Sequence, residues 1–195
     1  MNPSLELAHS AIELEQALRL LQWRFCFIGG IAVQHWGEPR HTIDLNLTLL
    51  TGFGGEADYI RQLTSLYVPR RIDMLEFAVT NRVVLLRDKR GTPLDISLGG
   101  MPFEERAIER AIQMPVLGEQ RITICSASDL IVHKVFAARE RDWLDVRGIL
   151  IRSQDQIDWR LVEWELRPLL ELKGSTEDWN RLVKLKQSID TVPPA

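Results

Sequence analysis

Residues 25–50 read FCFIGGIAVQHWGEPRHTIDLNLTLL, and they hold the clearest structural signals of the chain. The stretch opens with four apolar residues of β type that stop at Gly29-Gly30, where we expect a strand to turn into a helix over 31–36. Residues 42–50 then alternate polar and apolar side chains, the pattern of a strand with one buried face. The stretch therefore predicts a strand, a short helix and a second strand in succession.

The flanking sequence predicts further helices and strands. Apolar positions recur at helical spacing from Leu7 to Leu21, and Ser126 with Asp129 forms a capping box for a helix that runs to Arg139. The stretch 70–79 is ambiguous, with a helix favoured. The other predicted helices cover 56–66, 103–112, 142–152, 159–171 and 177–189. The other predicted strands cover 121–125 and a β-hairpin of 82–87 and 93–98.

The order of these elements indicates the class of fold. Strands and helices mix in the first part of the chain, and the last third is helical. This arrangement predicts an α+β core over 1–125, followed by a helical subdomain over 126–195 that packs on the core.

Composition and charge exclude several classes of protein. The chain has 195 residues, of which 45% are hydrophobic and 26% charged, so it can bury a core. Its net charge of −3 and pI near 5.8 provide no global basic field for nucleic acid, and we expect no recognition of duplex DNA. Residues 121–152 are locally positive, because they hold 6 basic and 4 acidic side chains. A phosphate would therefore need a local basic pocket.

The sequence also bears on location and on cysteine chemistry. No apolar run approaches the ~20 residues that cross a bilayer, and the first residues, MNPSLE, lack the regions of a secretion signal. Cys26 and Cys125 form no CxxC pair, and the four histidines form no HExxH pattern, which argues against zinc and thiol catalysis. We expect a cytoplasmic protein that does not bind membranes.

Gly29-Gly30 is the first candidate binding feature. Two glycines let a backbone approach a ligand closely, and the helix N-terminus that follows favours an anion such as phosphate. A tight turn without a ligand would have the same sequence, and the pair by itself favours that simpler explanation.

Polar residues on the predicted strands form the second feature. Asp44 and Asn46 are two residues apart, so both point to one side and can hold Mg²⁺ while phosphates hold it from the other side. Asp95 lies within the second hairpin strand, and the hairpin can bring it near Asp44 to complete a carboxylate cluster. A solvated polar face is the alternative for all three positions, although strand interiors disfavour Asp and Asn.

A charged run, KVFAARERDWLD, extends from Lys134 to Asp145. In an unbroken helix, Lys134, Arg141 and Asp145 would share one face. If a new helix is capped by Asp142 instead, Asp142 and Asp145 form a second acidic capping box. A solvent-facing helix is the usual explanation of such a run, but Trp143 leaves only one face for water.

The order of these features resembles the nucleotidyltransferase superfamily that includes DNA polymerase β. More narrowly, it is similar to the AbiEii/MenT-like bacterial nucleotidyltransferases, many of which are toxins of toxin–antitoxin pairs. The stretches that carry the resemblance are 27–33 with 36–47, then 92–96, then 127–147. The resemblance implies a polymerase β-like core, a small mixed sheet with flanking helices, followed by a C-terminal helical subdomain.

The resemblance also implies a role for each residue. Gly29 and Gly30 would hold the triphosphate through backbone N–H groups. Asp44, Asn46 and Asp95 would bind Mg²⁺ or Mn²⁺ as the catalytic residues, with Asp95 as the base. The other implied nucleotide-binding residues are Arg40, Lys134, Arg139, Arg141, Asp142 and Asp145. The implied enzyme moves an NMP from an NTP to a hydroxyl of a tRNA end or a protein, and an antitoxin would be a further partner.

Two positions depart from the pattern of that family. Gly30 stands where many members have Ser, and Asn46 stands where the second metal-binding Asp is expected. An amide oxygen still ligates Mg²⁺, but the site loses one negative charge. Asn46 therefore fits a weakened enzyme, an engineered inactivating change, or an impaired nucleotide- or partner-binding protein on the same fold.

A helical interaction module is a third alternative. It would use the tryptophans near the end of the chain, Trp159, Trp164 and Trp179. Their helical spacing is more typical of a core than of a binding surface.

Overall fold

The computed structural model describes residues 3–191. The chain divides into two compact units, Met1–Ile31 with His41–Cys125, and Ala32–Arg40 with Ser126–Ala195. The first unit carries the sheet, and the second is helical. The segment 32–40 thus belongs to the helical unit, although it connects the first two strands of the sheet.

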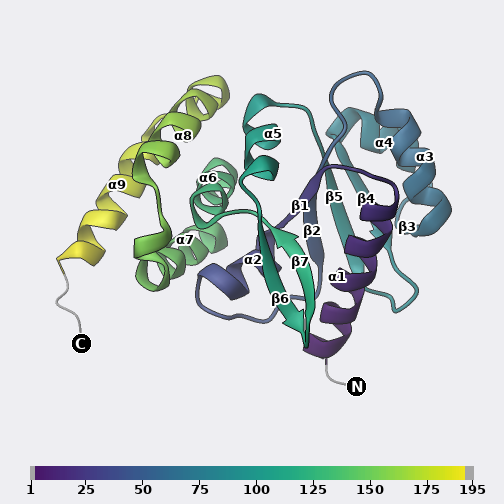
Figure 1. The fold of residues 1–195 in the computed structure, drawn as a ribbon. Helices are drawn as coiled ribbons and strands as arrows, with labels where there is room; N and C mark the ends of the chain where they lie inside the picture. Colours follow the sequence, from purple (N-terminus) through teal and green to yellow (C-terminus); the bar gives the residue numbers. More distant parts are fainter. Residues whose placement is uncertain (1–2, 192–195) are drawn as a thin grey trace. The chain divides into compact units, whose positions relative to one another are not determined.

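The sheet of the first unit is mixed (Figure 1). Within residues 3–191, seven strands follow the order β3-β4-β5-β2-β1-β7-β6. The pairs β2–β5 and β1–β7 are parallel, and the other neighbours are antiparallel. The strands are β1 (Phe25–Ile28), β2 (Leu45–Leu50), β3 (Val68–Pro69), β4 (Val83–Arg87), β5 (Pro93–Gly99), β6 (Ile112–Leu117) and β7 (Gln120–Ile124).

One face of this sheet forms the apolar core. Its fully buried side chains include Leu45, Leu47, Leu94, Ile96, Val84 and Leu86. Because side chains alternate along a strand, Asn46 lies on the opposite face from Leu45 and Leu47. The register pairs Asn46 with Asp95 on the neighbouring strand. The apolar alternation therefore places these two polar residues side by side.

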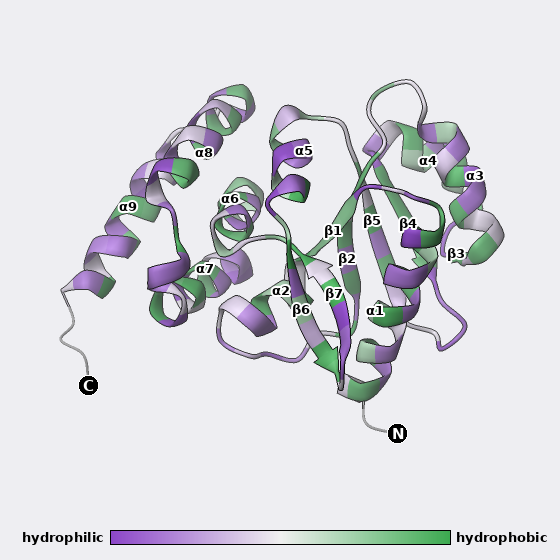
Figure 2. Cartoon of the chain, viewed as in Figure 1, coloured by the Kyte–Doolittle hydropathy of each residue, from purple (hydrophilic) through white to green (hydrophobic). Residues whose placement is uncertain are grey.

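Helix α1 (Pro3–Leu20) lies along the sheet (Figure 1). It alternates apolar and polar residues (Figure 2) and buries Leu7, Ala11, Leu14 and Leu18. Glu15 joins it to β7, because its Oε2 accepts the Thr123 backbone N–H over 2.9 Å. The other helices within this unit are α3 (Glu56–Leu66), α4 (Met74–Asn81) and α5 (Pro102–Glu109), and α2 (Gly29–Trp36) begins here.

The second unit is built from helices with clear sequence caps. They are α6 (Ala127–Ala137), α7 (Glu140–Arg152), the 3₁₀ turn η1 (Gln154–Gln156), α8 (Trp159–Lys173) and α9 (Glu177–Asp190). The hydroxyl of Ser126 accepts the Asp129 N–H at the start of α6, as the capping box predicts. The segment 32–40 is tied to this unit by Ser153, whose hydroxyl donates to the Trp36 carbonyl over 2.6 Å.

The structure confirms most predicted elements and corrects others. Helix α3 has the predicted bounds, and β4 and β5 form the predicted hairpin. The strand predicted over 42–50 begins at Leu45, so Asp44 precedes it. The helix predicted over 31–36 already begins at Gly29. Strand β6 over 112–117 was not predicted, because Met114 is its one buried residue among the described positions and the strand has no apolar alternation.

The C-terminal tryptophans are a further correction. None of the three is fully buried: Trp164 is 59% exposed, and Trp159 and Trp179 are half-buried, with Lys186 over the ring of Trp159 and Arg167 over that of Trp179. The helical spacing therefore marks a partly exposed helix surface here.

None of the helices in the described part of the chain is long and apolar enough to span a bilayer.

Candidate active site

The two glycines at the end of β1 are enforced by close packing. Gly29 has φ +64°, and a Cβ added there would lie 2.9 Å from the Asn46 Cβ. A Cβ on Gly30 would lie 2.3 Å from the hydroxyl oxygen of Thr42. The first turn of α2 therefore lies against the segment that leads into β2, and any larger side chain at Gly30 would displace Thr42.

Asp44 is held by two neighbouring side chains. The Thr42 hydroxyl donates to Asp44 Oδ1 over 2.9 Å, and Asn46 Nδ2 donates to Asp44 Oδ2 over 2.9 Å. Each carboxylate oxygen thus accepts at least one hydrogen bond, and this fixes the orientation of the carboxylate. Thr42, Asp44 and Asn46 follow one another at every second residue, so the spacing that indicated Asp44 and Asn46 also extends to Thr42.

Asp95 lies on β5, next to Asn46 in the strand register. Arg70, just after the edge strand β3, forms an ion pair with it. Burial raises the pKa of the Asp95 carboxyl above its ordinary value; the Arg70 charge opposes this shift, and the Asp44 charge adds to it. A raised pKa makes an ionised carboxylate a stronger base.

These contacts bring five of the predicted residues together in the first unit. Gly29 packs against Asn46, Gly30 packs against Thr42, and Asn46 is joined to both Asp44 and Asp95. The sequence did not indicate Arg70, because it follows an edge strand of two residues that has no apolar pattern. Thr42 could have been found from its spacing, because it precedes Asp44 by two residues and so points to the same side.

The side-chain oxygens of this group suit a magnesium site in which substrate phosphates supply the remaining ligands. Within the described residues, no group of three or more His, Cys, Asp and Glu side chains is placed to hold a metal ion. Mg²⁺ is commonly bound through one or two carboxylates together with substrate phosphates. The carboxylates of Asp44 and Asp95 and the amide oxygen of Asn46 fit that mode of binding, and a closed protein cage is not formed.

The other predicted residues form a buried charge cluster in the second unit. Lys134 Nζ lies 2.9 Å from Asp142 Oδ1 and 2.7 Å from Asp145 Oδ2. Arg40 makes a bidentate pair with Asp145, through Nε at 2.7 Å and Nη2 at 3.0 Å. The side chains of Lys134, Asp142 and Asp145 are 8%, 2% and 3% exposed. Lys134 thus ends in an ion-pair network and not on a solvated helix face.

A break between two helices creates this cluster. Helix α6 ends at Ala137, its C-cap residue Ala138 adopts φ 57°, and α7 begins at Glu140 with Arg139 as its N-cap residue. The unbroken helix is therefore wrong, and so is Asp142 as the cap. Asp142 is the third residue of α7, where its Oδ2 accepts the Arg139 backbone N–H over 3.3 Å. Arg141 is exposed in the same turn.

The ion pairs of this cluster shift the pKa values of Asp142 and Asp145. Burial by itself would raise the pKa of Asp142, but hydrogen bonds from Arg139 and Lys134 outweigh it and hold that pKa below its ordinary value. Burial has the same effect on Asp145, and hydrogen bonds from Arg40 and Lys134 lower its pKa. Both carboxylates are therefore ionised near neutral pH.

Comparison with known proteins identifies the fold. No family model and no curated protein sequence matches the chain. Two solved structures resemble it over most of its length. An antigenic nucleotidyltransferase-like protein from Paracoccidioides brasiliensis is 15% identical, with 93% of each chain covered and a TM-score of 0.51. The antibiotic-resistance factor ANT(2'')-Ia is 14% identical, with 93% of this chain and 99% of that chain covered and a TM-score of 0.54.

A third structure, the lincosamide antibiotic adenylyltransferase LnuA, is 12% identical and covers 70% of this chain and 92% of its own, but its TM-score of 0.44 is too low to add support. The first two likenesses show that the chain has the polymerase β-like nucleotidyltransferase fold. The α+β fold class predicted from the sequence is thereby confirmed.

Proposed function

We propose that the protein is a nucleotidyltransferase that moves an NMP from an NTP to an acceptor hydroxyl. The observation that carries this proposal is the group formed by Gly29, Asp44, Asn46 and Asp95, which contact or pair with one another at the ends of β1, β2 and β5. The group lies on a fold shared with solved nucleotidyltransferase structures.

Each member of the group has a role in this reaction. The backbone N–H groups of Gly29 and Gly30, at the start of α2, bind the triphosphate, because a helix N-terminus attracts anions. Asp44 and Asn46 hold Mg²⁺ or Mn²⁺ from the strand side. The bound ion supplies charge neutralisation at the α-phosphate. Asp95 accepts the proton of the attacking hydroxyl, a role that its raised pKa supports.

The cluster in the second unit has a supporting role. Two of the three Lys134 donors are directed at Asp142 and Asp145, and the third remains for phosphate. Arg40, Arg139 and Arg141 add positive charge to the same unit. We assign Asp142 and Asp145 the task of holding Lys134 and Arg40 in place.

The biological setting of this activity belongs to the same proposal. The resemblance of residues 25–150 to the AbiEii/MenT-like group supports a cytoplasmic toxin of a toxin–antitoxin pair. Its acceptor is a hydroxyl of a tRNA end or of a protein, and an antitoxin is its partner.

One contact favours a second candidate function. Asn46 directs its amide N–H₂, not its oxygen, at Asp44. Asp44 and Asn46, the two residues proposed to bind the metal, thus bond to each other. This contact fits an impaired nucleotide- or partner-binding protein on the same fold.

Transfer from labelled NTPs separates the two candidates. Each labelled NTP is incubated with Mg²⁺, total tRNA or protein, and either the native chain or Asn46→Asp. Transfer by the native chain supports the enzyme and identifies its nucleotide. Transfer by Asn46→Asp alone indicates an active fold silenced at one metal ligand. If neither transfers and the native chain still binds NTP, the binding protein is correct. Asp44→Ala is the negative control, and full activity in that variant contradicts the site.

A further inference from the structure

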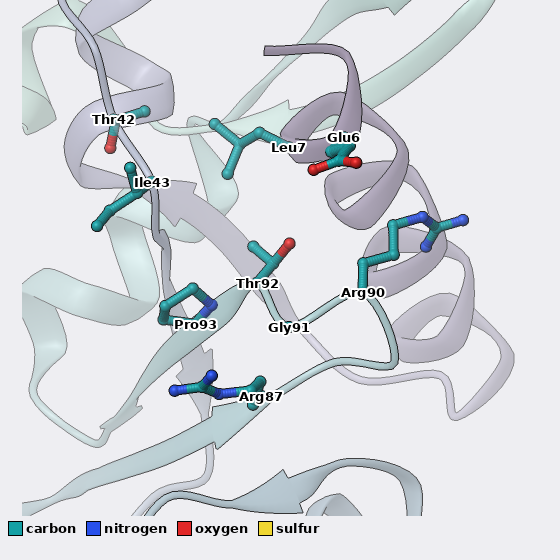
Figure 3. Close-up of a pocket in the computed structure, with 9 residues that line it drawn as sticks. All are labelled: Glu6, Leu7, Thr42, Ile43, Arg87, Arg90, Gly91, Thr92 and Pro93. Atoms are coloured by element: carbon teal, nitrogen blue, oxygen red, sulfur yellow. The ribbon is translucent and has the colours of Figure 1, made fainter. Parts of the chain in front are cut away.

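A pocket of about 320 Å³ lies beside the candidate active site in the first unit (Figure 3). Its walls come from the start of α1, the segment before Asp44, and the loop between β4 and β5. The residues that line it are Glu6, Leu7, Thr42, Ile43, Arg87, Arg90, Gly91, Thr92 and Pro93. This volume suits one small ligand of the size of a sugar phosphate or a mononucleotide.

The pocket shares residues with the group around Asp44 and Asp95. Thr42 lines the pocket and donates its hydroxyl hydrogen to Asp44 Oδ1 over 2.9 Å. Pro93 also lines it and precedes Asp95 by two residues on β5, so both point to one side of the strand roughly 6–7 Å apart. One residue of the pocket wall thus contacts Asp44, and another lies on the same strand face as Asp95.

Arg87 provides an available positive charge in the pocket wall. It ends β4 opposite Pro93 in the register, and Figure 3 shows the two residues side by side. Its side chain is exposed and makes no hydrogen bond or ion pair with any residue in the described range 3–191. A guanidinium group with all of its donors available is a preferred partner of a phosphate group.

Arg90 differs from Arg87, although both line the pocket. Its Nη1 and Nη2 lie 2.7 and 2.6 Å from the two Glu13 carboxylate oxygens, a bidentate pair. Figure 3 shows its guanidinium directed away from Ile43 and Pro93. Arg87 is thus the cation left for a ligand, while the Glu6 carboxylate on the far side of the pocket can accept hydrogen bonds from sugar hydroxyls.

We propose that this pocket is the acceptor site, and that it takes a phosphorylated sugar whose phosphate is bound by Arg87. The inference rests on the proposed nucleotidyl transfer. In that reaction a free hydroxyl oxygen of the sugar forms a bond to the α-phosphorus of the NTP. The bond from that phosphorus to the bridging oxygen breaks, pyrophosphate leaves, and the hydroxyl proton passes to Asp95. The sugar phosphate is either free or the terminal nucleotide of an oligonucleotide such as a tRNA end, so of the two acceptors proposed above this site favours the tRNA end over a protein.

Binding of ribose 5-phosphate tests the pocket without any turnover. The ¹⁵N-labelled full chain is titrated with ribose 5-phosphate, with ribose, and with a 5′-phosphorylated trinucleotide, and the Gly91 and Thr92 amide signals are followed. We expect saturable shifts with at least one phosphorylated probe, which also identifies its source, and much weaker shifts with ribose. Arg87→Ala should weaken binding about tenfold, because a charged hydrogen bond is lost. Arg87→Lys should have an intermediate effect.

Arg121→Ala is the matched control, because it removes an exposed arginine of the same unit outside the pocket. It should bind like the native chain. Absence of saturable shifts at Gly91 and Thr92, or equal affinity in the native chain and Arg87→Ala, overturns the pocket assignment and leaves the proposed reaction untouched. Arg87-dependent binding without any transfer from an NTP overturns both the acceptor role and the proposed function.

Discussion

Asn46 donates from Nδ2 to Asp44 Oδ2 over 2.9 Å, and the same residue is paired with Asp95 in the register of β2 and β5. A neutral amide therefore stands where a carboxylate would face the charges of Asp44 and Asp95. The hydrogen bond holds the group together without a cation. A carboxylate in its place would need a cation to offset the repulsion among like charges.

Asn46→Asp should make the fold dependent on Mg²⁺. Loss of the amide donor and the added repulsion should lower the free energy of unfolding by about 1 kcal/mol without Mg²⁺. Binding of the ion to the folded state should restore it. Thermal unfolding with and without Mg²⁺ measures both effects. Asn46→Ala is the control, because it removes the donor without adding charge. Absence of a Mg²⁺ response in both Asn46→Asp and the native chain would contradict a metal site here.

Gly30→Ala should destabilise the fold through a steric clash. The new Cβ would lie 2.3 Å from the Thr42 hydroxyl oxygen, and displacing Thr42 also removes its hydrogen bond to Asp44. We expect a loss of about 1–3 kcal/mol in chemical denaturation. Gly55→Ala is the control, because the nearest atom to its added Cβ is 3.9 Å away. If the two variants are equally stable, the tight packing of Gly30 on Thr42 is wrong.

The local sequence predicts this part of the molecule well, because its signals are short-range. The apolar alternation of β2 fixes which face Asn46 occupies, and the break at Gly29-Gly30 marks where β1 gives way to α2. The close approach of Thr42 to Gly30 is not readable in the same way. It depends on how the segment before β2 returns to the start of α2, a tertiary property.

The residues that sequence reasoning missed depend on tertiary contacts. Arg70 reaches Asp95 from just after a two-residue edge strand, and no local pattern indicates that pairing. The break between α6 and α7 falls at Ala138, a left-handed position that is normally occupied by Gly, so the sequence contains no marker for it. Without that break, the burial of Lys134 between Asp142 and Asp145 could not be predicted.

Lys134→Ala should destabilise the second unit strongly. The variant removes the ammonium shared by two buried carboxylates, which keep Arg139 and Arg40 as partners, and losing a hydrogen bond to a charged group costs about 1.5–3 kcal/mol. Chemical denaturation followed by tryptophan fluorescence gives this difference. Lys184→Ala, which removes an exposed lysine of α9, is the control and should have little effect. A Lys134→Ala variant as stable as the control would indicate that Lys134 lies on a solvated helix face and not in a buried ion-pair network.

The loss in Lys134→Ala should depend on pH. The folded-state pKa values of Asp142 and Asp145 are lowered, so their contribution to stability is present above the ordinary aspartate pKa of about 3.9 and is lost as pH falls through the folded-state values. Removing Lys134 takes away part of this contribution. The native chain and the variant should therefore differ most at neutral pH and converge in acid. A constant difference across that range would show that the loss is one of packing, not of charge.

Arg70→Ala should raise the pKa of Asp95 further. Burial and the Asp44 charge already raise this pKa, and the Arg70 charge is the influence that opposes them. A ¹³C NMR titration of the Asp95 carboxyl in the native chain and in Arg70→Ala measures the change directly. Arg71→Ala is the matched control, because its guanidinium pairs with Asp73, through Nε at 2.9 Å and Nη2 at 2.8 Å. An Asp95 pKa that moves equally in both variants would contradict the specific pair.

The same substitution should also move the pH profile of transfer. If Asp95 accepts the proton of the acceptor, the rate falls as pH drops through its pKa, because the protonated carboxyl can no longer act as a base. Arg70→Ala should shift this acidic limb to higher pH by the amount of the NMR shift, while Arg71→Ala leaves it in place. A limb that stays fixed in Arg70→Ala, although the NMR pKa moves, would assign the base to another residue.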